Sequence, residues 1–207
     1  FKKTNKFAAM LKMIPEYLEH LTNTFPKLVL IAEFTSEDEK SPMEQVLKTQ
    51  EALKKFNIHT RPVQSSDEEK YWILRRDSFN ILRHHSGDNM RTCPFIDDIV
   101  INPKDLPQFL PRLQSILKPY SNRITYTIAG HIGNGNFHII PLMNMSDPNI
   151  RALVPEISEK VFSLVFEFKG SMAAEHNDGL VRGMYLPQMY GEDIFQLFKQ
   201  VKLAFDP

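Results

Sequence analysis

The sequence predicts one α+β domain, covering residues 1–207, in which helices cover a largely antiparallel sheet. Two observations predict this fold class. Segments with apolar residues at helical spacing alternate with short apolar runs of strand length. An Asn-Gly pair between two strand-like runs is also typical of a tight antiparallel hairpin. No repeat, low-complexity stretch or Gly/Ser-rich linker divides the chain.

Six segments have the apolar spacing of helices, and five short runs have the composition of strands. Helix starts are marked by a capping residue followed by proline, as in Asp147-Pro148, and helix ends by glycine, as at Gly170. We expect helices over about residues 7–21, 41–53, 65–86, 102–117, 147–169 and 194–205. We expect strands over residues 27–34, 59–63, 95–101, 124–128 and 136–142.

Composition and charge exclude several classes of protein. Hydrophobic residues make up 42% of the chain and charged residues 24%, which is typical of a folded globular protein. The 25 Lys and Arg balance the 25 Asp and Glu, so no net charge attracts nucleic acid or an anionic membrane. A single cysteine, Cys93, favours a reducing compartment, and no run of about 18 apolar residues predicts a membrane span. We therefore expect a cytoplasmic protein without a transmembrane segment.

The Asn-Gly hairpin brings two histidines together. If Asn134 and Gly135 form a two-residue type I′ turn, His131 lies directly opposite His138 in the ladder. Directly opposed side chains have Cβ atoms about 4.5–5.5 Å apart, from which two imidazoles can bind one ion. Two hydrogen-bonded sheet histidines are the alternative interpretation, and a third ligand is needed to favour a metal.

Residues 171–179 offer that third ligand. Glu175 would complete a His₂-carboxylate set with open positions, which suits catalytic Zn²⁺, Mn²⁺ or Fe²⁺. His176 would then lie beside the metal, and its natural role there is that of a general base. The alternative is a solvated loop in which Asp178 caps the next helix.

These residues form a two-part pattern that resembles a known family. Its first part is Gly130-His131-x-Gly-x-Gly-Asn136-x-His138, and its second is Gly170-Ser171 followed by Glu175-His176. The pattern is similar to the C-terminal cap domain of the FAD-linked oxidases of the vanillyl-alcohol-oxidase type. The D-lactate, glycolate and D-2-hydroxyglutarate dehydrogenases belong to that branch. The resemblance implies ferredoxin-like repeats, and an N-terminal FAD-binding domain that is not part of this chain.

The resemblance also implies roles for individual residues. His131, His138 and Glu175 match the ligands of a divalent metal in the metal-dependent members. His176 matches the base that lies between substrate and flavin and takes the proton of the 2-hydroxyl group while hydride passes to the flavin. Together with Asn177, which replaces the glycine usual in the family, His176 is expected to contact the FAD.

Substrate binding is implied by a second short pattern. Trp72-x-x-Arg75 resembles the family's Trp-x-x-Arg, whose arginine binds the substrate carboxylate, and a guanidinium suits this role because it can donate two parallel hydrogen bonds. Arg76 takes this role if the register differs by one residue, and a charge on a helix surface is the alternative interpretation of Arg75. Three polar positions that help the 2-hydroxyglutarate enzymes hold substrate correspond here to Phe79, about Ile96, and Ile140. A second substrate carboxylate would lose its partners, so a smaller or more apolar 2-hydroxy acid is favoured.

The sequence therefore predicts the substrate domain of an FAD-dependent oxidoreductase that converts a lactate- or glycolate-like D-2-hydroxy acid to the 2-oxo acid. Its expected partners are this small molecule, FAD and the FAD-binding half of the protein, without which the chain should be inactive. The electron acceptor stays open. A metal-dependent hydrolase using the same His₂-Glu site is the first alternative function. The second is a non-catalytic cap module that binds a ligand.

Overall fold

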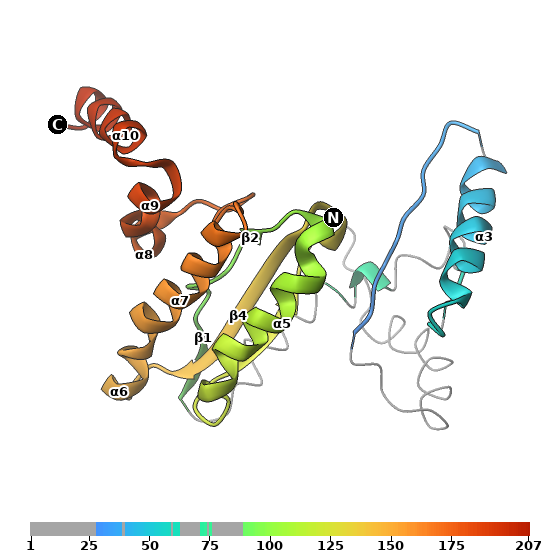
Figure 1. Ribbon diagram of the computed structural model, residues 1–207, viewed down its shortest axis with the longest axis horizontal. Helices are drawn as coiled ribbons and strands as arrows, with labels where there is room; N and C mark the ends of the chain where they lie inside the picture. Colours follow the sequence, from blue (N-terminus) through green and yellow to red (C-terminus); the bar gives the residue numbers. More distant parts are fainter. Residues whose placement is uncertain (1–27, 39, 59, 63–70, 74, 76–88) are drawn as a thin grey trace. The chain divides into compact units, whose positions relative to one another are not determined.

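A computed structural model describes residues 28–38, 40–58, 60–62, 71–73, 75 and 89–207 (Figure 1). The chain divides into two compact units, residues 1–80 and 81–207, and each unit is described by itself. The grouping of both into one domain stays a prediction. In the described part of the chain, no helix is both long and apolar enough to cross a membrane.

Among the described residues of the first unit, α3 (Lys40–Lys54) confirms the helix predicted at residues 41–53. The strand predicted at 27–34 is wrong over its described residues, because 28–34 form no strand and the side chains of Leu28 and Val29 are exposed. A strand needs a neighbouring strand to complete its hydrogen bonds, and no described residue pairs with this run. The described residues of the predicted strand 59–63 also form no strand.

Other predictions for this unit lie partly or wholly outside the described residues. The helix expected at 7–21 cannot be compared with the structure, because all of its residues fall in the first undescribed segment. Of the helix expected at 65–86, only residues 71–73 and 75 are described, and they are helical.

The second unit is built around the long strand β4 (Asn136–Asn144). It pairs antiparallel with β1 (Met90–Thr92), β2 (Ile99–Val100) and β3 (Thr125–Ala129), so the predicted antiparallel sheet is confirmed. Leu142 pairs with Thr92 of β1 and with Thr125 of β3, which places these two strands on opposite edges of β4. β2 is shorter than the predicted run of 95–101, because Asp98 adopts a left-handed conformation with φ of 66°.

The order of these elements is the βαββα of a ferredoxin-like unit, with an isolated bridge at Ser171 in the place of its last strand. β2 is followed by α5 (Leu106–Leu117), β3, β4, the short helix α6 (Pro148–Arg151) and α7 (Leu153–Glu167). Chain direction then reverses, and Ser171 bridges to Val100 on the outer edge of β2. Figure 1 shows α5 and α7 side by side over the same face of the sheet. The described residues thus show the element order of one ferredoxin-like unit, and the predicted repeat of this unit stays a prediction.

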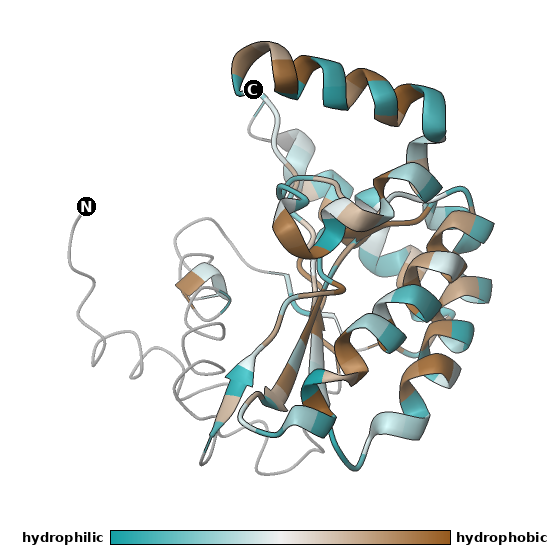
Figure 2. Cartoon of the chain, turned by 90° about the vertical axis from the view of Figure 1, so that its left-hand side faces the viewer, coloured by the Kyte–Doolittle hydropathy of each residue, from teal (hydrophilic) through white to brown (hydrophobic). Residues whose placement is uncertain are grey.

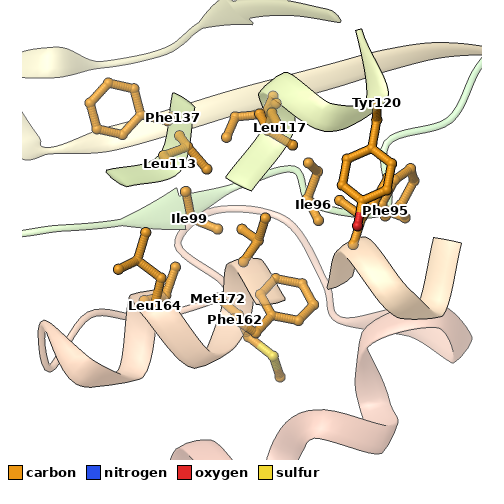
Figure 3. Close-up of a cluster of buried hydrophobic side chains, with 14 of the residues drawn as sticks. Phe95, Ile96, Ile99, Leu113, Leu117, Tyr120, Phe137, Phe162, Leu164 and Met172 are labelled. Carbon is orange, nitrogen blue, oxygen red and sulfur yellow. The ribbon is translucent and has the colours of Figure 1, made fainter. Parts of the chain in front are cut away.

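The hydrophobic core lies between these two helices and the sheet (Figure 3). β4 contributes Phe137, Ile139 and Met143, which are alternate residues on one face of the strand. The predicted apolar stripes of both helices are buried, and each such side chain stabilises the fold by about 1.5–3 kcal/mol. The buried helix residues are Leu106, Phe109, Leu113 and Leu117 of α5, and Leu153, Ile157, Ser158, Val161, Phe162, Leu164 and Val165 of α7.

The hairpin between β3 and β4 has a different turn from the predicted one. Its loop contains four residues, the 3₁₀ turn η3 (Ile132–Asn134) and Gly135, and of these only Gly135 has positive φ, at 72°. The backbone of His131 pairs with Asn136, so the predicted pairing of His131 with His138 is wrong. A contact distant in sequence explains the difference. Gly135 packs on the end of β2, where its carbonyl accepts the N–H of Ile101 and an added Cβ would lie 1.7 Å from the Ile101 oxygen.

The chain ends in four short or amphipathic helices: α8 (Gly179–Arg182), η4 (Gly183–Tyr185), α9 (Leu186–Tyr190) and α10 (Glu192–Phe205). The helix predicted at 194–205 is confirmed by α10. Its apolar stripe is not buried against the rest of the second unit, and Phe198 and Val201 remain 41% and 60% exposed. Figure 2 shows α10 extending from this unit with hydrophobic and hydrophilic residues alternating along it.

Candidate functional site

The face of the sheet opposite the core carries His138. Because side chains alternate along β4, Phe137 and Ile139 enter the core while His138 and Ile140 point to the other face. His138 is only 5% exposed. Its partner in the ladder is Ala129, and His131 follows two residues later on the same side of the chain. The two imidazole centroids are therefore 5.9 Å apart despite the changed register.

The loop of residues 171–178 reaches this face from the edge of β2. Ser171 and Val100 exchange two backbone hydrogen bonds, of 2.8 and 3.0 Å, at the point where α7 has ended. The preceding residue must be glycine, because a Cβ on Gly170 would lie 2.4 Å from the Val100 carbonyl oxygen. The loop then exposes Glu175, His176 and Asn177 at its tip.

Asp98, which is fully buried, holds the backbone of this tip. Its carboxylate accepts N–H bonds from Ala174 (2.7 Å), His176 (2.9 Å) and Glu175 (3.1 Å), and also the side-chain amide of Asn136 (3.0 Å). Burial alone would raise the pKa of Asp98, but these four hydrogen bonds together lower it. Asp98 is thus a charged anchor for the loop.

Arg182 at the end of α8 holds the same loop through its carbonyl groups. The guanidinium, on a residue only 5% exposed, donates to the oxygens of Asp97 (2.7 Å), Met172 (2.9 Å) and Asn177. A planar guanidinium can reach several acceptors at fixed angles, which a lysine cannot do. The loop is therefore fixed from both sides, its N–H groups by Asp98 and its carbonyls by Arg182.

The ring nitrogens of two predicted metal ligands, His131 and His138, both lie close to a carboxylate oxygen of the third, Glu175. Oε1 of Glu175 lies 2.8 Å from Nε2 of His138 and 3.4 Å from Nε2 of His131. Two imidazole nitrogens and one carboxylate oxygen within this range fit a divalent transition metal. Asp98, His138, Glu175 and His176 also offer ligand atoms within 4.8 Å of one another. Of these, Asp98 is the least suited to bind a cation, because its oxygens already accept the loop N–H groups.

Asp97 connects the two histidines at the bottom of the site. Its Oδ1 lies 3.1 Å from Nδ1 of His138, and its Oδ2 lies 3.1 Å from Nδ1 of His176. The two rings are stacked with centroids 4.9 Å apart and an angle of 16° between their planes. The hydrogen bond that the His138 ring donates to Asp97 raises the pKa of His138 against the effect of burial, and the charges of Asp97, Glu175 and Asp98 raise it further. This negative environment favours any cation held by His138.

The structure brings together four of the predicted site residues, His131, His138, Glu175 and His176, in the second unit. Asn177 follows directly and its carbonyl is held by Arg182. Arg75 belongs to the first unit, where it lies in a helical segment. Its role in binding a carboxylate stays a prediction.

Sequence reasoning missed Asp97, Asp98 and Arg182. A signal for the first two is present, because two adjacent acidic residues interrupt the otherwise apolar run of 95–101. Carboxylates in such a run are buried only when they are paired or hydrogen-bonded. No comparable signal marks Arg182, whose sequence neighbourhood is that of an ordinary exposed helix.

Comparison with known proteins shows the family to which the chain belongs. The sequence matches the profile of the family described as "FAD linked oxidases, C-terminal domain" over residues 7–207. The chain belongs to this family.

The curated relatives include enzymes with three different names. The chain is 30% identical over 139 residues to the D-2-hydroxyglutarate dehydrogenase of Escherichia coli, a match covering 67% of this chain and 13% of the relative. It is 28% identical over 173 residues to the "Probable D-lactate dehydrogenase, mitochondrial" of Danio rerio, covering 81% and 33%. It is 27% identical over 138 residues to the glycolate oxidase subunit GlcD of Escherichia coli, covering 67% and 26%. The match thus spans a third or less of each of these relatives.

Proposed function

We propose that this chain is the substrate domain of an FAD-dependent oxidoreductase that oxidises a small D-2-hydroxy acid to the 2-oxo acid. One observation carries the proposal: Nε2 of His131 and Nε2 of His138 both lie within 3.4 Å of one Glu175 oxygen, and the ring of His176 stacks on that of His138. Family membership favours this reaction over the metal-dependent hydrolase that the same side chains would suit. The family also implies FAD, which would be bound mainly by a part of the protein outside residues 1–207, with His176 and Asn177 contacting it.

The metal would be held by His131, His138 and Glu175, and Zn²⁺, Mn²⁺ or Fe²⁺ each suits this donor set. A bound divalent cation supplies Lewis acidity, which lowers the pKa of a hydroxyl group that it binds. The protein holds two of these donors in place through buried carboxylates. Asp97 contacts the ring of His138, and Asp98 accepts the backbone N–H of Glu175.

His176 would accept the proton of the substrate hydroxyl. Because its Nδ1 faces the Asp97 carboxylate at 3.1 Å, the ring proton of the neutral imidazole belongs on Nδ1, and Nε2 carries the lone pair. The ring is half exposed at the loop tip, where a substrate can reach it. FAD, when bound, supplies the acceptor for the two electrons that leave the substrate carbon.

One local side chain supports a small substrate. Ile140 lies two residues beyond His138 on the same face of β4 and cannot pair with a second carboxylate, so lactate or glycolate fits this region better than 2-hydroxyglutarate. Ile96 instead belongs to the hydrophobic core. Arg75 is proposed to bind the single carboxylate that all these acids share. A cytoplasmic location, inferred from the single cysteine, is part of the same proposal.

The test is turnover by the full-length protein that contains this chain and its FAD-binding part. D-Lactate, glycolate and D-2-hydroxyglutarate are supplied with an artificial electron acceptor. We expect the two smaller acids to be oxidised faster, and His176→Gln to lower kcat at least about 100-fold because it removes the base. Lys118→Gln, on the exposed turn after α5, serves as the control and should leave kcat unchanged. Absence of turnover with every acid would contradict the proposal and favour a non-catalytic module.

A further inference from the structure

Each of the two carboxylate oxygens of Asp97 lies within hydrogen-bond distance of an imidazole ring. Oδ1 faces Nδ1 of His138 and Oδ2 faces Nδ1 of His176, each at 3.1 Å. The carboxylate side chain is 11% exposed, and that of His138 is 6% exposed, so little water competes for these bonds. One buried side chain therefore contacts both the proposed metal ligand and the proposed base.

Anchoring of the loop does not require this carboxylate. The loop N–H groups bind Asp98, and its carbonyls bind Arg182, which reaches Asp97 only through the main-chain oxygen. The Asp97 side chain is thus left for the rings. A purely structural role would leave the position of the ring protons unconstrained, whereas an ionised carboxylate accepts hydrogen bonds and donates none.

We propose that Asp97 is a positioning residue that keeps the ring proton of both His138 and His176 on Nδ1. This inference rests on the proposed function, in which His138 binds the metal and His176 accepts the substrate proton. Nε2 of His138 faces a second carboxylate, Oε1 of Glu175 at 2.8 Å, which competes for the same ring proton. Asp97 is the more buried of the two carboxylates, so its bond to Nδ1 is the less screened one and would leave Nε2 free for a metal. Nε2 of His176 is likewise kept as the atom that accepts the substrate proton. The shared carboxylate also fixes the stacked arrangement of the two rings.

Asp97→Asn tests the proposal with almost no change of shape. An amide accepts a hydrogen bond through Oδ1 but donates through Nδ2, so one of the two rings must present Nδ1 without a proton. His138 is the ring expected to change, because Glu175 can accept a proton moved to its Nε2. With that nitrogen protonated, Zn²⁺ must displace the proton, and we expect the affinity of the chain for zinc to fall about 10–100-fold.

Two measurements on the 207-residue chain decide the matter. Nitrogen-15 NMR of histidine-labelled protein, at a pH where both rings are neutral, locates each ring proton. Zinc titration gives the metal affinity. Wild type should carry both protons on Nδ1, and Asp97→Asn should carry that of His138 on Nε2 with weaker zinc binding. Asp147→Asn is the matched control, because asparagine caps α6 as well as aspartate does, and it should change neither result.

The proposal is overturned if either wild-type ring carries its proton on Nε2, or if Asp97→Asn changes neither the proton positions nor the zinc affinity. Failure of the wild-type chain to bind zinc would instead count against the metal in the proposed function. The NMR result does not depend on zinc, so it would still decide the role of Asp97.

Discussion

The two segments that form the site are held by different kinds of interaction. The hairpin that carries His131 and His138 is part of a ladder of five residue pairs between β3 and β4. The loop of residues 171–178 has one backbone bridge, at Ser171, and otherwise depends on the side chains of Asp98 and Arg182. Backbone pairing fixes a segment through its neighbours in sequence, whereas a side-chain anchor fixes it through a residue that lies far away in sequence. The hairpin should therefore be coupled to global stability, and the loop mainly to the geometry of the site.

Gly135→Ala should have the largest effect on stability, because the added methyl group would clash with backbone atoms that cannot move aside. The residue has φ of 72°, and a Cβ would lie 1.7 Å from the Ile101 oxygen, so the turn must separate from β2. We expect the free energy of unfolding, measured by urea denaturation, to fall by about 3 kcal/mol. Gly133→Ala is the matched control in the same loop, where nothing lies within 4 Å of the added Cβ, and it should change stability by less than about 0.5 kcal/mol. Equal effects of the two variants would contradict the described turn.

Asp98→Ala should have the next largest effect, concentrated in the loop. It leaves the N–H groups of Ala174, Glu175 and His176 without their acceptor. We expect a loss of about 2 kcal/mol in unfolding free energy, together with faster amide hydrogen exchange at these three residues. Exchange in β4 should become faster only to the extent that global stability falls. If the loop amides exchange no faster relative to β4 than in wild type, the loop is not held by Asp98.

The comparison of these segments also shows what the sequence could predict. Alternating residues and the Asn-Gly pair predicted the hairpin and the proximity of its histidines, because these signals are local. They did not predict the four-residue loop, which is determined by the contact of Gly135 with Ile101. Glu175 and His176 could be named as site residues, but not their support, because Asp98 lies 76–78 positions away from the loop amides that it binds.

The same distinction applies to the helices. Apolar periodicity predicted both α7 and α10, yet Ile157 and Val161 of α7 are fully buried while Leu197 of α10 is 53% exposed. Periodicity indicates that a helix has an apolar face, and only the tertiary structure determines what covers that face. The strand predicted at residues 27–34 is wrong over its described residues for a related reason, because an apolar run forms a strand only when a partner strand is available.

The pH dependence of the loop should follow Asp98. Its pKa is lower in the folded chain, so its stabilising contribution is complete above the usual aspartate pKa of about 3.9. That contribution is lost as the pH falls through the lower folded-state pKa. The difference in unfolding free energy between wild type and Asp98→Asn, about 1–2 kcal/mol at neutral pH, should therefore shrink in acid below about pH 4. A difference that stays constant or grows on acidification would show that the Asp98 charge does not stabilise the fold.

Arg182→Lys should have the smallest effect of these variants. An ammonium group cannot reach the carbonyls of Asp97, Met172 and Asn177 together, so we expect a loss of about 1 kcal/mol in unfolding free energy. Arg123→Lys is the control, because Arg123 is exposed and its side chain donates to one carbonyl, that of Asn149. An equal change in both variants would mean that the three-carbonyl contact adds nothing.

The central claim is that the hairpin and the loop together form one metal site, and zinc titration of the 207-residue chain tests it most directly. We expect wild type to bind one ion, and His138→Gln and Glu175→Gln, which remove a donor from the hairpin and from the loop, each to weaken binding at least about 100-fold. A wild-type chain that binds no zinc, or variants that bind it as tightly as wild type, would contradict the account.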